Sequence, residues 1–268
     1  MRAQEAGWGM RALGAAFAAA ALLAAAASAA APSRWIDYFD ATVGRTCVQS
    51  LTVNAGTETV VASGSQRVVS VTHAGGGARI LDSVTTTVRA SPPTGTTPGP
   101  LRQTVAYTFA RDGVAFSPSG FSFDGYSYSY DGSERYPSLS ALRAGRSITG
   151  TVTLGLRGAT PTTAAALEKL LAPGHDTLNV AVQYRTGPAP ERNSIATPAG
   201  TFRDPIGVSF RVAGARVQDA NESAKVNLPA LLGQLASAIS ANTYFTAGVG
   251  PVSTTTRGQT WLLAGCSG

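Results

Sequence analysis

Lysine, histidine and cysteine are scarce in this chain of 268 residues, and charged residues make up only 13% of it. The arginines that carry most of the positive charge are scattered singly, whereas a nucleic-acid binder concentrates basic residues in a patch or stripe. Neither His73 nor His175 has a cysteine near it in the sequence, so no metal-ligand set is present. The sequence therefore predicts no nucleic-acid partner, no metal and no cofactor.

The motifs of common enzyme classes are also missing. The chain has no Gly-x-Ser-x-Gly elbow, no Ser-x-x-Lys spacing, no phosphate-binding loop and no His-Glu-x-x-His. Acidic pairs are present, Asp37 with Asp40 and Asp131 with Glu134, and paired carboxylates are the chemistry of glycosidases. We expect a non-catalytic protein, with an envelope hydrolase of glycosides or esters as the alternative.

The only two cysteines, Cys47 and Cys266, stand near the two ends of the chain. In an exported protein a lone pair is most economically explained by one disulfide. Such a bond would join the first strand to the last, whereas two unpaired thiols are the alternative.

Residues 1–31 have the pattern of a secretory signal. Arg2 and Arg11 precede an apolar, alanine-rich run that ends in an Ala-Ser-Ala triplet at 27–29. An uncleaved membrane anchor is the alternative, because the run approaches the length that spans a bilayer. We predict export to the periplasm or the cell exterior, no transmembrane segment after cleavage, and a single β-rich domain over 32–268.

The rest of the chain has a β-sheet composition, rich in Thr, Ser, Val and Gly. Before residue 100 we expect four strands, at 46–55, 58–63, 66–74 and 78–90. The Pro/Gly-rich stretch 91–100 is interpreted as a long loop inside one domain, because the segment before it is too short to fold alone.

Three Asp-Gly pairs punctuate an aromatic segment between residues 101 and 136. Asp-Gly is the strongest short signal for a two-residue hairpin turn, since both positions need positive φ. We therefore predict an antiparallel meander. Its turn residues are Asp112, Gly113, Asp124, Gly125, Asp131 and Gly132.

The turn at 124–125 fixes which side chains face each other. Counting outward from it, Phe123 faces Tyr126, Ser122 faces Ser127, and Phe121 faces Tyr128; the same arithmetic at 112–113 places Phe109 opposite Phe116. Alternation along each strand then places all the aromatic rings on one face and the serines on the other. The aromatic face is either part of the core or a ligand-binding surface. The candidate ligand-binding residues are Tyr107, Phe109, Phe121, Phe123, Tyr126, Tyr128 and Tyr130.

Two short helices are expected after the meander. Pro161 and Thr162 open an apolar-striped segment over 163–172, which Pro173-Gly174 ends. Asn227 is a suitable N-cap for a second helix over 228–239, whose leucines recur at helical spacing. Both stripes are typical of helices that pack on a sheet.

Three segments, 136–154, 194–202 and 243–252, resemble a broad group of exported bacterial β-domains of unknown function. That group carries a Pro-Ala-Gly-Thr-Phe turn and a Tyr-Phe-x-x-Gly-Val-Gly hairpin, matched here at the turn residues Pro198, Gly200, Gly248 and Gly250. The group is similar in architecture to the lipoprotein-carrier (LolA/LprG-like) half-barrels. Pro251 departs from the pattern and predicts that its strand lies at a sheet edge.

The resemblance implies a mainly β fold, with a curved antiparallel sheet (half-barrel) and two short helices packed on one face. We expect a secreted or periplasmic protein that binds a hydrophobic small molecule in the concave face or serves a structural role in the envelope. A surface adhesion module that uses exposed tyrosines is a further alternative.

Overall fold

The computed structural model describes residues 32–55, 58–74, 77–91, 99–123, 125–222, 240–256 and 259–268. The predicted signal over 1–31, Asp124 and the predicted helix over 228–239 therefore lie outside the described residues. Within the described part of the chain, no helix is both long and apolar enough to cross a membrane.

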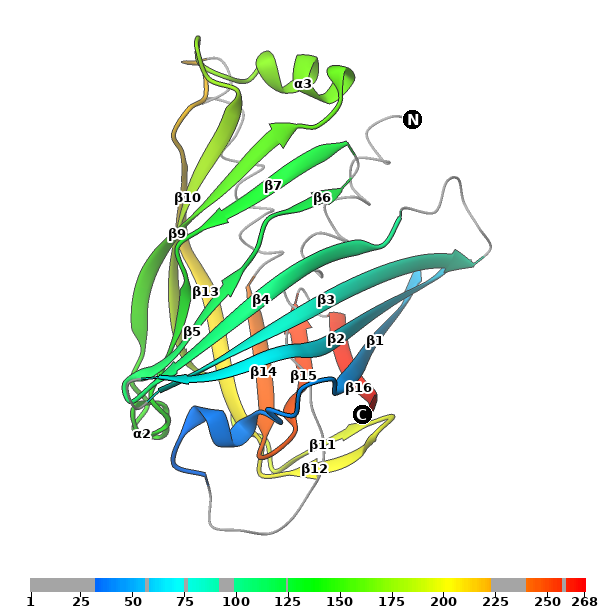
Figure 1. The fold of residues 1–268 in the computed structure, drawn as a ribbon, viewed down its shortest axis with the longest axis vertical. Coiled ribbons are helices and arrows are strands. Elements are labelled where there is room, and N and C mark those ends of the chain that lie inside the picture. The colour runs from blue at the N-terminus through cyan, green and yellow to red at the C-terminus, as the bar shows by residue number, and fades with distance from the viewer. Residues whose placement is uncertain are drawn as a thin grey trace.

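Sixteen strands and three short helical segments make up the described fold (Figure 1). The strands are β1 (Thr46–Ala55), β2 (Glu58–Ala74), β3 (Gly77–Ser91), β4 (Leu101–Ala110), β5 (Gly113–Pro118), β6 (Phe121–Phe123), β7 (Tyr126–Asp131), β8 (Glu134–Pro137), β9 (Ile148–Gly158), β10 (Thr177–Pro188), β11 (Ser194–Thr197), β12 (Gly200–Arg203), β13 (Ile206–Val217), β14 (Ala241–Thr246), β15 (Gly250–Thr256) and β16 (Gln259–Ser267). The helical segments are η1 (Trp35–Tyr38), α2 (Leu139–Arg143) and α3 (Pro161–Glu168).

Fourteen of these strands form one antiparallel sheet, in the order β6-β7-β9-β10-β13-β14-β15-β16-β1-β2-β3-β4-β5-β8. The sheet bends strongly, so that β1–β4 form one wall and β9, β10 and β13 form another (Figure 1). Only the β11–β12 hairpin stands apart from it. The predicted mainly β fold with a curved antiparallel sheet and two short helices is confirmed.

One of the two described α-helices was predicted. In α3, Pro161 occupies the first turn, and the Thr160 hydroxyl accepts a hydrogen bond from the Thr163 amide at 3.2 Å. The helix ends at Glu168, earlier than the expected 172. The other helix, α2, was missed because it has only five residues, too few to show a helical period.

The strand predictions before residue 100 hold, with one correction. The two strands expected at 58–63 and 66–74 are a single strand, β2, which pairs with β3 along its length. At the expected break, Gly64 and Ser65 pair with Thr86 and Thr85 without interruption, and the register shifts only further along, between Val68 and Ser70.

The aromatic meander is only partly correct. β6 and β7 pair as predicted, with Phe121 opposite Tyr128. The first hairpin turns one residue earlier than expected, so Phe109 lies opposite Val114, and Phe116 lies opposite Tyr107. Gly113 is the first residue of β5 and not part of the turn, and a side chain there would collide with the Tyr136 carbonyl of β8.

The pair at 131–132 is not a hairpin turn. β7 already has β6 and β9 as neighbours, so β8 crosses to pair with β5 at the other end of the sheet. The free edge of β8 is covered by side chains of β10: the Tyr184 hydroxyl donates to the Ser133 carbonyl at 2.9 Å, and Thr186 donates to the Arg135 carbonyl. These bonds hold β8, the last strand in the order, against β10, the fourth strand from the other end of the sheet.

The N-terminal segment closes one end of the curved sheet. Trp35, Tyr38 and Phe39 are buried there, and the Trp35 indole donates to the Pro137 carbonyl at 2.7 Å. The Phe39 ring lies 5.1 Å from that of Tyr107 and 5.0 Å from that of Phe109. Within the described residues, this segment covers Tyr107 and Phe109 of the predicted aromatic face, whereas α3 packs in a separate cluster. We call the N-terminal segment the end plug, residues 35–39.

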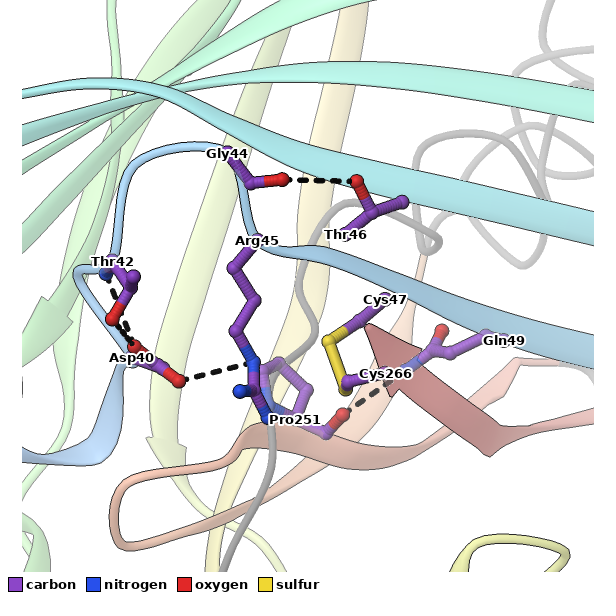
Figure 2. The surroundings of a disulfide bond; sticks show 9 residues. All are labelled: Asp40, Thr42, Gly44, Arg45, Thr46, Cys47, Gln49, Pro251 and Cys266. Carbon is purple, nitrogen blue, oxygen red and sulfur yellow. Dashed lines mark hydrogen bonds and ion pairs between the residues drawn. A yellow bond between two sulfur atoms is a disulfide. The ribbon is translucent and has the colours of Figure 1, made fainter. Parts of the chain in front are cut away.

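The predicted disulfide is present and ties β1 to β16 (Figure 2). Cys47 and Cys266 lie opposite each other in the register of the two strands. Pro251 does not mark a sheet edge, because β15 lies between β14 and β16. It occupies a register shift in the β14–β15 pairing, where its carbonyl accepts a hydrogen bond from the Gln49 amide at 3.2 Å (Figure 2).

The turn residues of the resemblance have plain backbone roles. Pro198 and Ala199 connect β11 to β12, and Gly200 has a φ of 133° where Thr197 pairs with it. Gly248 (φ 65°) and Gly250 (φ 88°) form the turn from β14 to β15. Positive φ values of this kind favour glycine.

Candidate functional site

The predicted ligand-binding aromatics do not form one continuous surface. Tyr107 and Phe109 are buried in the core cluster that contains the end plug. Phe121 is buried and stacks on the half-buried Tyr128, with ring centroids 4.6 Å apart. Tyr126 and Tyr130 are half-buried, and Phe123 pairs through its backbone with Tyr126.

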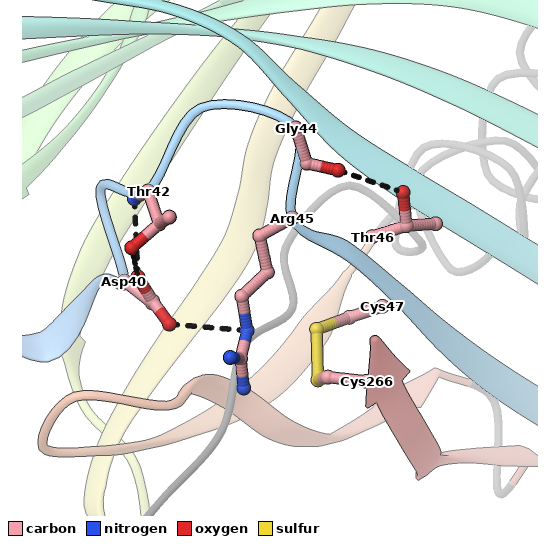
Figure 3. Close-up of polar contacts among 7 residues, drawn as sticks. All are labelled: Asp40, Thr42, Gly44, Arg45, Thr46, Cys47 and Cys266. Atoms are coloured by element: carbon pink, nitrogen blue, oxygen red, sulfur yellow. Dashed lines mark hydrogen bonds and ion pairs between the residues drawn. A yellow bond between two sulfur atoms is a disulfide. The ribbon is translucent and has the colours of Figure 1, made fainter. Parts of the chain in front are cut away.

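The acidic pairs proposed for hydrolysis have other partners. Asp40 forms an ion pair with Arg45 at 3.0 Å and accepts hydrogen bonds from Thr42 (Figure 3). Asp37 pairs with the exposed Arg34 at 2.8 Å. Asp40 thus organises the loop that leads from the end plug into β1, whereas Asp37 caps the start of η1 through Arg34.

Asp131 and Glu134 also fail to converge. Asp131 is exposed, whereas Tyr130, the preceding residue on β7, donates its hydroxyl to Glu134 at 3.0 Å. Burial raises the pKa of Glu134 to about 7 and raises the pKa of Tyr130. The half-buried Glu134 therefore belongs to the junction between the two ends of the sheet. Within the described residues, no group of three or more His, Cys, Asp or Glu side chains is placed to bind a metal.

Four polar residues lie on the concave face around Val84 of β3. Gln66 of β2 and Gln103 of β4 lie directly opposite Val84 on its two sides, and Asp82 and Thr86 precede and follow it by two residues. All are buried: the exposed fractions are 1% for Gln66 and Asp82, 4% for Thr86 and 6% for Gln103. We call these four residues the polar quartet.

The polar quartet is internally connected only in part. The Gln66 amide nitrogen donates to Asp82 Oδ2 and to the Tyr107 hydroxyl, the latter at 3.3 Å. One polar atom on each member finds no hydrogen-bond partner among the described residues: Gln66 Oε1, Asp82 Oδ1, Thr86 Oγ1 and Gln103 Oε1. Buried polar atoms of this kind are rare in folded proteins, because each costs free energy unless it is paired.

Burial raises the pKa of Asp82 to about 7, while the hydrogen bond from Gln66 opposes the rise. A carboxyl whose pKa is higher in the folded than in the unfolded chain favours folding while it is protonated. That stability is fully present below the unfolded value near 4 and is lost as the pH rises through the folded value.

We therefore expect stability to fall between about pH 4 and pH 7, since Asp82 and Glu134 both have raised pKa values. Urea unfolding of the purified protein across this range measures the slope. In the double variant Asp82→Asn/Glu134→Gln the slope should be smaller, whereas Asp131→Asn, at an exposed position, should leave it unchanged. An equal slope in all three proteins would contradict this assignment.

Apolar residues continue the concave face beyond the polar quartet. On the β1–β4 wall and the adjacent β16, Leu51, Ala62 and Trp261 are buried together, with Val53 and Val88 beside them. The other wall carries a separate cluster that includes Val152, Val180, Val182, Tyr184 and Phe210. β10 is fourth and β2 tenth in the strand order, so the two clusters lie on different walls of the curved sheet (Figure 1).

The polar quartet lies at the border between two apolar regions. Along β2, Val68 belongs to the closed-end core and Ala62 to the wall cluster, with Gln66 between them. Along β3, Ile80 belongs to the core and Val88 packs on the wall cluster, with Asp82 and Thr86 between them. The concave face thus has an aromatic closed end, a polar band and apolar walls.

Sequence reasoning did not identify the polar quartet, although one signal was available. The strand 78–90 was predicted, and its apolar positions alternate with polar ones. Asp82 occupies the same phase as Ile80, Val84 and Val88, and so points to the apolar face. An ionisable residue in the apolar phase of a strand is the pattern that marks such a site.

No protein family and no curated protein matches the sequence. In fold, the chain is similar to a "putative lipoprotein" from Parabacteroides distasonis, with a TM-score of 0.50 and 13% identity over 86% of this chain and 98% of that one. It is also similar to a "putative exported protein with YmcC-like fold" from Bacteroides fragilis, with a TM-score of 0.46 and 10% identity over the same shares. At such identity the first likeness shows a common fold, and nothing about activity follows from it.

Proposed function

We propose that this protein is an exported, non-catalytic β-domain that holds the apolar chain of a lipid-like ligand against its concave face. The observation that carries the proposal is the division of that face into an aromatic closed end, a polar band and two separate apolar wall clusters. A face with apolar walls and a few polar groups at one level is typical of small-molecule sites.

The division suits an amphipathic ligand. Leu51 and Trp261 on one wall, and Val182 and Phe210 on the other, would contact a hydrocarbon chain. The closed end would stop the chain from passing through, because Phe39 and its aromatic neighbours fill it.

The alternatives have less support from the geometry. A glycosidase needs two carboxyls that converge, and Asp131 is exposed while Glu134 is half-buried against Tyr130. An adhesion surface needs exposed rings, and Tyr126, Tyr128 and Tyr130 are each half-buried.

Export rests on three supports. The sequence carries the pattern of a secretory signal, and a disulfide such as Cys47–Cys266 is typical of an oxidising compartment. The similar protein from Parabacteroides distasonis is described as a "putative lipoprotein". We therefore place this protein in the periplasm or outside the cell.

Tryptophan quenching by a bromine-labelled chain tests the proposal. Trp261 lies in a wall cluster and Trp35 in the end plug, so each reports on one region. In a Trp8→Phe background, bromododecane should quench the fluorescence of the Trp35→Phe variant, whose remaining tryptophan is Trp261. It should leave the matched Trp261→Phe variant, which retains Trp35, largely unquenched.

A second pair of variants checks the location. Leu154 lies on the concave face opposite Val180 and is half-buried, whereas Val61 on β2 is 41% exposed. Leu154→Gln should weaken the quenching of Trp261, and Val61→Gln should not. Absence of quenching in both tryptophan variants of the folded protein would refute the proposed function.

A further inference from the structure

We propose that the polar quartet binds the uncharged hydroxyl head of an amphipathic ligand, such as a long-chain alcohol. This inference deepens the proposed function and rests on it, because the apolar walls would hold the chain of the same molecule. It adds which end of the ligand enters first and which head groups the protein accepts.

The geometry of the polar quartet favours a single small head group. Residues directly opposite on neighbouring strands have Cβ atoms about 5 Å apart, and residues two apart on one strand about 7 Å. Gln66, Gln103, Asp82 and Thr86 therefore surround one point, the fully buried Val84, on the concave face. Asp82 and Thr86 lie about 14 Å apart on β3, so a small head group would contact neighbouring members of the polar quartet and not all four at once.

The free atoms of the polar quartet are mainly acceptors. Gln66 directs its amide nitrogen to Asp82 and Tyr107, which leaves Oε1 as its unpaired atom among the described residues. Gln103 Oε1 and Asp82 Oδ1 also accept, while the Thr86 hydroxyl both donates and accepts. A ligand hydroxyl matches this set, since it can donate to an amide or carboxyl oxygen and accept from Thr86.

Charge argues against an anionic head. A carboxylate or phosphate beside the buried Asp82 would bring a negative charge into the site. The arginine ion pairs among the described residues are formed with Asp37, Asp40 and Asp176, and none of them is at the polar quartet. The raised pKa of Asp82 is consistent with a neutral site. A methyl ether of the same chain lacks the donor, so it would leave acceptors of the polar quartet unpaired.

A chain-matched ligand series tests the inference: dodecanol, dodecyl methyl ether, dodecanoate and dodecylammonium. Each competes with bromododecane for quenching of Trp261 at pH 6, below the raised pKa of Asp82. We expect dodecanol to compete about 10- to 100-fold better than the ether, the range for leaving a buried partner unpaired. Dodecanoate should be at least tenfold weaker than dodecanol, and dodecylammonium should not exceed it.

Matched variants locate the effect. Thr86→Val and Gln103→Leu remove polar atoms from the polar quartet while keeping similar shapes. Thr108→Val and Gln183→Leu make the same changes at exposed strand positions. The first pair should reduce the preference for alcohol over ether to less than threefold without weakening ether binding, and the second pair should leave it unchanged.

Thermal unfolding of the same variants separates binding from architecture. If the polar quartet is a ligand site, Thr86→Val and Gln103→Leu should be at least as stable as the parent, because they remove unpaired buried polar atoms. Equal competition by alcohol and ether would overturn the inference. The inference would also fail if Thr86→Val and Gln103→Leu lost stability but kept the preference for alcohol over ether. It would fail as well if dodecylammonium or dodecanoate bound more tightly than dodecanol. If bromododecane does not quench Trp261 in the parent protein, the proposed function itself fails.

Discussion

Replacement of both Cys47 and Cys266 by serine should lower the free energy of unfolding by about 3–5 kcal/mol. The disulfide joins residues 219 positions apart, so it restricts the unfolded chain far more than a bond across a short loop. For a protein of this size the loss corresponds to a fall in melting temperature of about 10 °C.

The control for this prediction is chemical reduction. A reductant should lower the melting temperature of the parent protein by a similar amount, and it should have no effect on the double serine variant. A variant that melts with the oxidised parent would mean that pairing of β1 with β16 already holds the chain ends together without the bond.

The second large effect is expected at the end plug. Phe39→Ala should cost about 3–5 kcal/mol, because it removes a buried ring that contacts Tyr107, Phe109 and Phe245. Phe39→Leu keeps much of the volume and should cost less. Urea unfolding monitored by circular dichroism measures both.

Val43 provides the matched control, since it lies in the loop after the end plug and is 60% exposed. Val43→Ala should change stability by less than about 0.5 kcal/mol. If Phe39→Ala is equally mild, the end plug packs loosely and does not close the sheet.

Local pattern predicted much of this fold. Alternation identified most strands and their faces, and the Asp-Gly turn at 124–125 gave the register of Phe121 with Tyr128. The same signal misled at 112–113, where Gly113 begins β5 and lies against the Tyr136 carbonyl of β8. A turn rule considers only neighbours in sequence, whereas this contact joins residues more than twenty positions apart.

The parts that sequence reasoning missed depend on distant contacts. The crossing of β8 to β5 follows from β7 having both edges occupied, which no local pattern encodes. The end plug is too short to show periodicity, although its three aromatic residues are all buried. Alternation placed Tyr107, Phe109 and Phe116 on one face, and all three are buried in the same core cluster. Whether the candidate aromatic residues bind a ligand stays a prediction.

The position of β1 between β2 and β16 has a consequence for biosynthesis. A ribosome finishes β1 long before it makes β16, so the partner edge of the first strand stays bare until translation is almost complete. Bare edges recruit other strands and promote aggregation. Loss of β16 would leave this edge of β1 bare in the finished protein, and we expect such a truncated chain to aggregate more readily than the full chain.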